Sequence, residues 1–561
     1  MKKTCLSMVF IFAAMLAAMQ SLSLSGCATT KDGPPAPPAK AVAGQSGLQI
    51  TSKSPAAQAA FDEALTFTYA FNHGAAERAY RKAAELDPNC AMAWWGVALV
   101  NGPHINFPMV PPGKAATAWE ALQKAQALAP GADAREQALI GALATRYANP
   151  QPEDRKALDE AYAAAMRGVY EAYPNDADIA TLYAESMMDL RPWDLWTAEG
   201  QPQPGTELIA ATLEHAMDLD PAHPGANHYY IHTVEASREP GRAEAAADRL
   251  RDAAKTMPPG STHLVHMPSH IYARVGRWQD AADANAAAMV ANKAYRAANP
   301  RPGFFALYMT HNEHFFAYSA MMQGRSEEAL EAARAMVAAM PPEFVADFAA
   351  VADGFMIFPS EVLMRFGKWE AILEEPQPAE GLPLSRALWR FTRAVALTAL
   401  NRMDDAEKER QAFQEAVGKV PADWTFGNNA ASGILTVASG VLDGEMAAQR
   451  GDYAQSVKRL EEAIAVEGKM RYDEPPDWIQ PVRHTLGAVL LRAGQYADAE
   501  RVYREELAIN PENGWSLFGL YRALHLQEKT DEAARMKARF EKAWSQSDIP
   551  MVSSCLCQPG V

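Results

Sequence analysis

Repeated helical hairpins are the feature that most restricts how this 561-residue chain folds. Alanine-rich segments with helical periodicity run through most of the sequence, and strand-like alternation is almost absent. One hairpin closes with Ala76, Tyr80, Ala83 and Pro88 at fixed spacing. Small alanines let two helices approach each other, an aromatic ring fills the remaining gap, and proline ends the pair. The pattern predicts an all-α fold of stacked hairpins.

The same combination of small and aromatic residues returns around the turns of later hairpins, whose marker residues are Tyr272, Gly276, Trp278 and Ala281; Gly324 and Ala329; Gly451, Tyr453, Leu460 and Ala463; and Leu486, Gly487, Gly494, Tyr496, Ala499, Tyr503 and Pro511. In these residues the chain resembles the tetratricopeptide-repeat family, in separated patches rather than throughout. The resemblance implies an irregular helical-hairpin solenoid, a right-handed superhelix with loop insertions. It also implies that the first helix of each unit lines a concave groove, with its second, fifth and ninth residues facing that groove.

Three stretches interrupt the hairpins: Asn101 to Gly113, Arg191 to Gly205 and Ala352 to Pro383. The second carries Trp193 and several prolines, so we interpret it as a loop that folds over the groove. The third separates two arrays. The predicted organisation is a signal peptide (1–26), a Pro/Ala-rich tether (27–52), an N-terminal array with the histidine-rich groove (53–380), a C-terminal array (381–546) and a tail (547–561).

The N-terminus has the pattern of an export signal. Lys2 and Lys3 precede an apolar stretch from Met8 to Met19, and Leu24-Ser25-Gly26-Cys27 follows. This end resembles the lipobox of bacterial lipoproteins, which implies that Cys27 becomes the lipidated N-terminus; an ordinary secretory leader is the alternative. The resemblance places the protein in the bacterial cell envelope, on the outer or cytoplasmic membrane, facing the periplasm or exterior.

Charge argues against nucleic acid as a partner. The chain has a formal net charge of −16 and shows no basic stripe that would match a phosphate backbone. An acidic surface is an equally poor match for anionic lipid, so membrane attachment is expected to come from the lipid anchor. The remaining candidate partners are an extracytoplasmic protein or peptide, a small ligand and a metal.

Histidines are concentrated in one part of the chain. Nine of the thirteen lie between His215 and His314, and two pairs, His228/His232 and His266/His270, have a spacing of four. That spacing places two imidazoles on one helix face.

The repeat phase implied by the family resemblance assigns these residues to the groove. His263, His266 and His270 take its second, fifth and ninth positions, and His228 and His232 take the fifth and ninth of the preceding unit. The other groove candidates in this phase are Glu185, Glu235, His311, His314 and Tyr318.

Imidazole nitrogens bind zinc and copper well, so His228, His232, His266 and His270 form a candidate zinc or copper site. Three functions stay open: a scaffold whose groove binds a ligand such as a metal, a metal-dependent enzyme of hydrolase type, and a protein-binding scaffold with structural histidines. The sequence has no Gly-x-Ser-x-Gly elbow, phosphate loop or His-Glu-x-x-His helix, which favours binding over catalysis.

Three cysteines remain beyond the leader and Cys27, namely Cys90, Cys555 and Cys557. The Cys555-x-Cys557 motif fits a disulfide, a binding motif for a soft metal or a plain tail. The sequence does not fix the pairing, and we interpret the motif as a tail.

Overall fold

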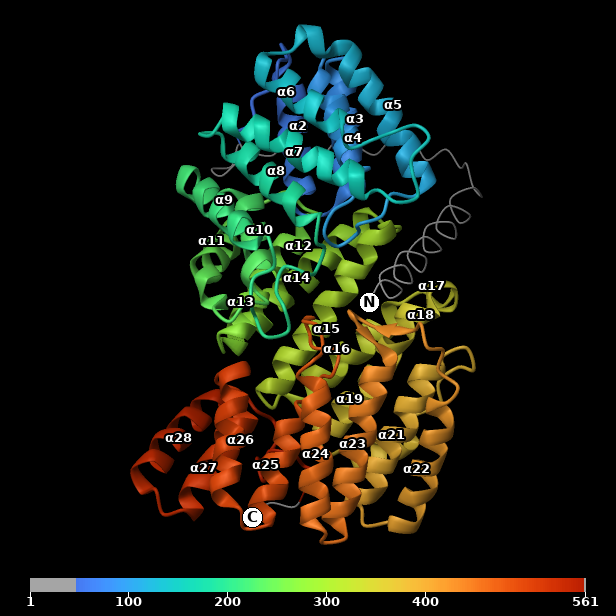
Figure 1. Ribbon diagram of the computed structural model, residues 1–561, viewed down its shortest axis with the longest axis vertical. Coiled ribbons are helices and arrows are strands. Elements are labelled where there is room, and N and C mark those ends of the chain that lie inside the picture. The colour runs from blue at the N-terminus through green and yellow to red at the C-terminus, as the bar shows by residue number, and fades with distance from the viewer. Residues whose placement is uncertain (1–46, 559–561) are drawn as a thin grey trace. The chain divides into compact units, whose positions relative to one another are not determined.

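The computed structural model describes residues 47–558, and its regular secondary structure is almost all helical (Figure 1). Cys27, the signal peptide and most of the tether lie outside these residues. Residues 47–52, predicted as the end of the tether, are packed: Leu48 is buried, and the Ile50 amide donates to Gln58 Oε1 at 2.9 Å. In the described part of the chain, no helix combines the length and apolarity needed to cross a membrane.

The elements up to residue 298 are, in chain order, α2 (Pro55–Tyr69), α3 (His73–Leu86), α4 (Ala91–Leu99), α5 (Pro112–Leu128), η1 (Ala129–Gly131), α6 (Ala134–Ala144), α7 (Lys156–Ala172), α8 (Ala177–Met188), α9 (Thr206–Leu219), α10 (Pro224–Val234), η2 (Pro240–Ala243), α11 (Glu244–Ala254), α12 (Thr262–His266), α13 (Pro268–Arg274) and α14 (Trp278–Ala298).

The remaining elements are η3 (Gly303–Phe305), α15 (Ala306–Met322), α16 (Ser326–Ala339), α17 (Pro342–Asp347), α18 (Ala349–Ala352), η4 (Asp353–Ile357), α19 (Phe358–Arg365), α20 (Trp369–Glu374), α21 (Pro383–Ala399), α22 (Met403–Val417), β1 (Thr425–Phe426), β2 (Asn429–Ala430), α23 (Ala431–Gln449), α24 (Tyr453–Glu467), α25 (Val482–Arg492), α26 (Tyr496–Ile509), α27 (Gly514–Leu526) and α28 (Thr530–Ala543). The two short strands form an antiparallel pair, with Thr425 opposite Ala430.

Helical hairpins dominate, as predicted. α2 packs on α3, α21 on α22, α23 on α24, α25 on α26, and α27 on α28 (Figure 1). The predicted contact of aromatic and small residues is present in α25 and α26, where a Cβ atom added to Gly487 would lie 2.3 Å from the Tyr503 ring. The all-α, tetratricopeptide-like fold with loop insertions is therefore confirmed.

The chain divides into two compact units. The first comprises the described residues up to Ile271 together with Ala287–Met309, and the second comprises Tyr272–Ala286 and the described residues from Thr310 onward. The boundary predicted near residue 380 falls between α20 and α21, inside the second unit.

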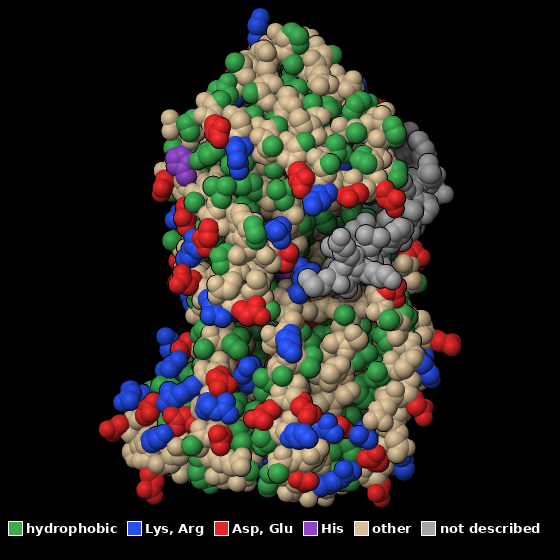
Figure 2. Space-filling view, in the orientation of Figure 1, with side chains coloured by type: hydrophobic (Ala, Val, Ile, Leu, Met, Phe, Trp, Pro, Cys, Tyr) green, Lys and Arg blue, Asp and Glu red, His purple; other side chains and the backbone are tan. Residues whose placement is uncertain are grey.

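Each predicted interruption of the hairpins departs from regular repeats in the structure. The stretch from Asn101 forms a loop with a bridge between His104 and Phe107 and ends where α5 begins at Pro112. Arg191 to Gly205 forms a loop between α8 and α9. The stretch from Ala352 to Pro383 contains only the short elements η4, α19 and α20 between its ends. Acidic and basic side chains are intermingled on the face shown in Figure 2, which agrees with a surface that has no basic stripe there.

Candidate metal centre

Two histidines and a glutamate come from the end of one helix in the first unit. Pro224 occupies the first turn of α10, where its missing N–H costs nothing, and His223 caps the helix by accepting the Ala226 N–H on Nδ1 at 3.0 Å. His228 and His232 follow at a spacing of four, and Glu235 ends the helix as its C-cap.

The next histidines lie on either side of a helix break. α12 ends at His266, and α13 begins at Pro268, which lacks the N–H that would continue the helical ladder. His263 and His266 therefore belong to α12, whereas His270 belongs to α13. The repeat phase predicted the shared face of these residues but not the break between them.

The side chains of His228, His232 and His263 lie close together. One ligand atom from each residue lies within 4.8 Å of the others. The ring centroids of His228 lie 4.9 Å from those of both His232 and His263. All three side chains are buried, with exposed fractions of 0%, 6% and 2%, so the open groove expected from the sequence is replaced by an interior cluster.

The hydrogen bonds of His228 and His232 fix which nitrogen carries the proton. His228 Nδ1 lies 2.6 Å from the Tyr69 carbonyl oxygen, and His232 Nδ1 lies 2.7 Å from Glu235 Oε1. A carbonyl or carboxylate oxygen accepts, so each Nδ1 donates and each Nε2 keeps its lone pair. Both Nε2 atoms, and both ring nitrogens of His263, are buried without a hydrogen-bond partner among the described residues.

A close helix contact supplies the Tyr69 carbonyl. A Cβ atom at Gly225 would lie 2.5 Å from the Tyr69 ring, so glycine lets α10 lie directly against the end of α2. The Tyr69 hydroxyl donates to Asp178 Oδ1 at 2.7 Å, and the same oxygen lies 3.0 Å from His223 Nε2. Burial raises the pKa of Asp178, but His223 and the Tyr69 hydrogen bond outweigh it, and the net shift is downward. The carboxylate therefore stays ionised and holds both helices.

Glu235 links α10 to α13. Its Oε2 accepts from His270 Nδ1 at 2.5 Å, while Oε1 accepts from His232. Burial alone raises the pKa of this carboxyl group, yet His270 and His232 outweigh it and the net shift is downward. His270 Nε2 then accepts from His266 Nε2 at 2.8 Å, and Ser269 Oγ lies 3.4 Å from His266 Nδ1. His266 and His270 thus extend the hydrogen-bonded network behind His232.

Aromatic rings enclose the three imidazoles. The Phe71 ring lies 4.7 Å from that of His228 and 5.6 Å from that of His263, and Phe71 adopts a left-handed φ of 54° that is uncommon for a bulky residue. Tyr308 lies edge-on to His263 at 4.7 Å. Trp193, from the Arg191–Gly205 loop, lies edge-on to His232 at 5.5 Å, as the predicted folding of this loop over the site requires.

Burial keeps these imidazoles neutral. It lowers the pKa of His228 and of His263 well below the ordinary value, with neighbouring histidines lowering both further. Burial also lowers the pKa of His232, although Glu235 opposes the shift. Neutral imidazole is the form that binds metals.

Two further histidines adjoin the enclosure. The His104 ring stacks on Phe71 at 4.6 Å and lies 4.5 Å from the His73 ring. Burial lowers the pKa of His73 to about 3 and that of His104 well below its ordinary value. His73, the first residue of α3, and His104, from the Asn101–Gly113 stretch, thus both lie against the Phe71 ring of the histidine cluster.

The other predicted groove residues have the following neighbours. Glu185 is buried beside Asp189 and Arg146, and burial raises its pKa despite the arginine. In the second unit, His314 packs edge-on against Phe358 at 4.5 Å, and His311 lies 6.0 Å from Phe315. Tyr318, also in that unit, lies 5.6 Å from Trp278.

Replacing Glu235 with glutamine is expected to weaken zinc binding by about 10–100-fold. The carboxylate accepts two Nδ1–H groups, whereas an amide oxygen accepts only one of them and the amide nitrogen meets the other as a donor. Either His232 or His270 must then change its tautomer or lose its bond. Competition with a chromophoric chelator measures the affinity; equal affinities for Glu235→Gln and the exposed control Glu239→Gln would contradict this role.

Comparisons with known proteins identify no family for the chain. No family description matches it, and no curated protein matches it. Solved structures with similar folds include the human IFIT1 dimer with PPP-AAAA, at 14% identity and a TM-score of 0.32, covering 86% of this chain and 88% of that one. Another is the P58(IPK) TPR domain, at 12% identity and a TM-score of 0.20, covering 85% and 99%. Similarities at this level carry no information on ligand or partner.

Proposed function

We propose that this protein is a helical-repeat binding protein whose first unit holds one transition metal ion, zinc or copper, between His228, His232 and His263. The observation that carries the proposal is a set of three buried imidazoles, each with at least one ring nitrogen that has no hydrogen-bond partner among the described residues. One ring nitrogen from each lies within 4.8 Å of the others. Buried polar atoms without partners are costly, and a bound cation would give each imidazole a partner.

The surroundings of the three imidazoles support a metal more than a packing role. Metal-binding histidines usually donate their second N–H to a carboxylate or backbone carbonyl, as His232 and His228 do here. Nitrogens on one zinc ion lie about 3.3 Å apart when each bond is about 2.0–2.1 Å. The ring nitrogens, within 4.8 Å of one another, therefore need to approach by about 1.5 Å or less to share one ion.

The proposed ligand set differs from the sequence prediction in one respect. His263 replaces His266 and His270, since these two are engaged with each other and with Glu235. Three neutral imidazoles suit both Zn²⁺ and Cu²⁺, so direct competition between the two ions identifies the preferred one. The Cys27 anchor predicted from the sequence would hold this binding protein at the cell envelope.

Metal analysis of protein purified without a histidine tag tests the proposal. We expect one zinc or copper ion per chain after dialysis, and after replacement by Co²⁺ a visible spectrum typical of four-coordinate cobalt. A chain that retains no metal and shows no binding when titrated with Zn²⁺ or Cu²⁺ would refute it, leaving the histidines with a packing role.

A further inference from the structure

The C-terminal segment of the described chain is held inside the second unit by specific hydrogen bonds. Ser554 Oγ donates to the His484 carbonyl at 2.8 Å and lies 2.6 Å from the Tyr503 hydroxyl, which must therefore be the donor. Gln558 accepts from Arg492 through its side-chain oxygen and donates to Glu445 through its side-chain nitrogen. The segment predicted as a plain tail is thus packed, and both cysteines between these anchors are buried.

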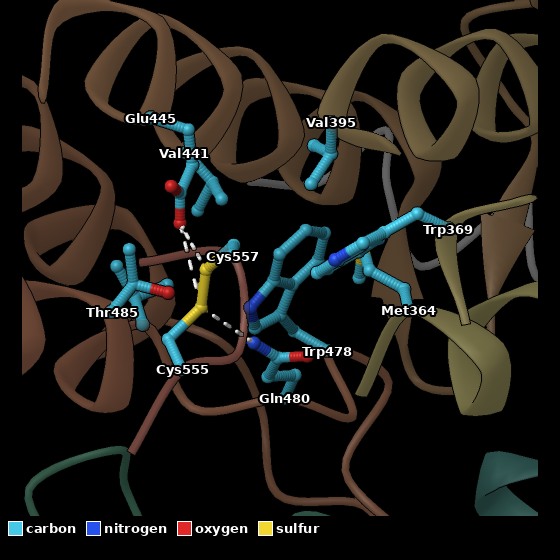
Figure 3. A pocket seen from close by; sticks show the side chains of 11 residues that line it. Met364, Trp369, Val395, Val441, Glu445, Trp478, Gln480, Thr485, Cys555 and Cys557 are labelled. Atoms are coloured by element: carbon cyan, nitrogen blue, oxygen red, sulfur yellow. Dashed lines mark hydrogen bonds between the residues drawn. A yellow bond between two sulfur atoms is a disulfide. The ribbon is translucent and has the colours of Figure 1, made fainter. Parts of the chain in front are cut away.

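Both sulfur atoms face one buried carboxylate. Cys555 and Cys557 form a disulfide, and Glu445 Oε1 lies 3.6 Å from the first sulfur and 2.6 Å from the second (Figure 3). Glu445 comes from α23 and is 1% exposed. Ligand atoms from these three residues all lie within 4.8 Å of one another.

A small pocket adjoins the sulfurs. Met364, Trp369, Val395 and Val441 line it with apolar groups, and Trp478 and Gln480 also contribute (Figure 3). The indole nitrogen of Trp478 and the side-chain oxygen of Gln480 are buried without hydrogen-bond partners among the described residues. Gln480 lies beside Cys555, with its amide nitrogen 3.8 Å from the sulfur. The pocket therefore holds polar groups that the protein itself does not satisfy.

In the oxidised protein, the two sulfurs offer Glu445 no hydrogen-bond donor. A disulfide sulfur carries no proton, so it donates nothing to the carboxylate oxygen beside it. A cation at the position of the sulfurs would give this buried oxygen a charged partner.

We propose that Cys555, Cys557 and Glu445 form, once the disulfide is reduced, a site for one thiophilic cation such as Zn²⁺. Two thiolates and a carboxylate are ligands that Zn²⁺ accepts, with about 2.3 Å to sulfur and about 2.0–2.2 Å to oxygen. The two Cα atoms are 5.3 Å apart, which lets both sulfurs reach one ion after they separate. The site uses residues of the second unit alone and is independent of the histidine centre.

The redox step balances with a dithiol as reductant. A thiolate of the reductant attacks one sulfur, the Cys555–Cys557 bond breaks, and the reductant leaves as its own disulfide. Its two hydrogens end on the two cysteine sulfurs. The cation then displaces these two protons to solvent, so that thiolates bind the metal. Oxidation reverses the sequence and releases the ion.

Cadmium titration of the full chain tests this site, because cadmium–thiolate charge transfer absorbs in the near ultraviolet and cadmium–imidazole binding does not. A trialkylphosphine reduces the disulfide, taking the oxygen of water to become the phosphine oxide, and is then removed without air. We expect two additional thiols per chain and one cadmium equivalent with charge-transfer absorption in reduced protein, against none in oxidised protein.

Variants separate the site from other thiols. Cys555→Ser/Cys557→Ser should abolish the absorption, Glu445→Gln should weaken cadmium binding about tenfold or more, and Cys90→Ser, which removes a buried cysteine of the first unit, should change neither. Failure of the native protein to gain thiols, absence of the band after reduction, or its persistence in the double variant would overturn the proposal. None of these outcomes bears on zinc binding at the histidines, which is measured on oxidised protein.

Discussion

Zinc affinity of the oxidised protein is expected to fall at least about a thousandfold when His232 and His263 are both replaced by alanine. Four-ligand zinc sites contribute about 10–16 kcal/mol, or roughly 3 kcal/mol for each ligand. Losing two of three imidazoles therefore removes about 5 kcal/mol or more, and each 1.4 kcal/mol corresponds to about a tenfold change in affinity. Calorimetric titration with Zn²⁺ measures the change, and saturating zinc should raise the melting temperature of the native protein but not of the variant.

The matched control for this variant is His73→Ala/His104→Ala. Both histidines belong to the first unit, where His104 is buried and His73 is half-buried, and His104 stacks on the same Phe71 ring. Neither belongs to the group of three neighbouring imidazoles. Their removal also deletes two imidazoles and should preserve zinc affinity within a few fold. Equal losses in both double variants would show that zinc binding reports packing rather than coordination, and no loss in either would place the ion elsewhere.

The sequence predicted the histidine cluster because helical phase is a local property. A spacing of four places His228 and His232 on one face, and the repeat phase places His263 on a neighbouring first helix. Which histidines form the proposed metal site depends on their hydrogen-bond partners, and the helical phase does not identify these. The carbonyl that orients His228 belongs to Tyr69, 159 residues earlier, and Glu235 contacts His270 across a helix break that starts at Pro268.

The burial of the site could not be predicted from the sequence for a similar reason. A solenoid groove is open by construction, but here Phe71, Tyr308 and the Trp193 loop fill the space around the imidazoles. Phe71 reaches them through a left-handed backbone conformation, which no periodicity predicts. The cysteine pair shows the same limit, since the tail lies outside the repeats and its contact with Glu445 spans more than a hundred residues.

Tyr503→Ala is expected to destabilise the second unit by about 3–5 kcal/mol, the range for removing a large buried aromatic side chain. Tyr503 is fully buried, and Cβ atoms added to Gly487 or Gly519 would lie 2.3 Å and 2.1 Å from its ring. The two glycines therefore form a close-fitting slot for this ring, and their helices cannot collapse into the space without moving backbone. Denaturant unfolding measures the loss, and Tyr496→Ala, a half-buried residue of the same helix, should cost less.

Tyr503→Phe divides the effect between packing and the tail. It keeps the ring in its slot and removes only the hydroxyl that donates to Ser554. A buried hydrogen bond contributes about 1 kcal/mol, so the phenylalanine variant should retain most of the stability that alanine loses. Because Ser554 is one of the two anchors on either side of Cys555 and Cys557, the same variant should also weaken cadmium binding by the reduced protein. Equal destabilisation by phenylalanine and alanine would mean that the hydroxyl, rather than the fit of the ring between Gly487 and Gly519, holds α25, α26 and α27 together.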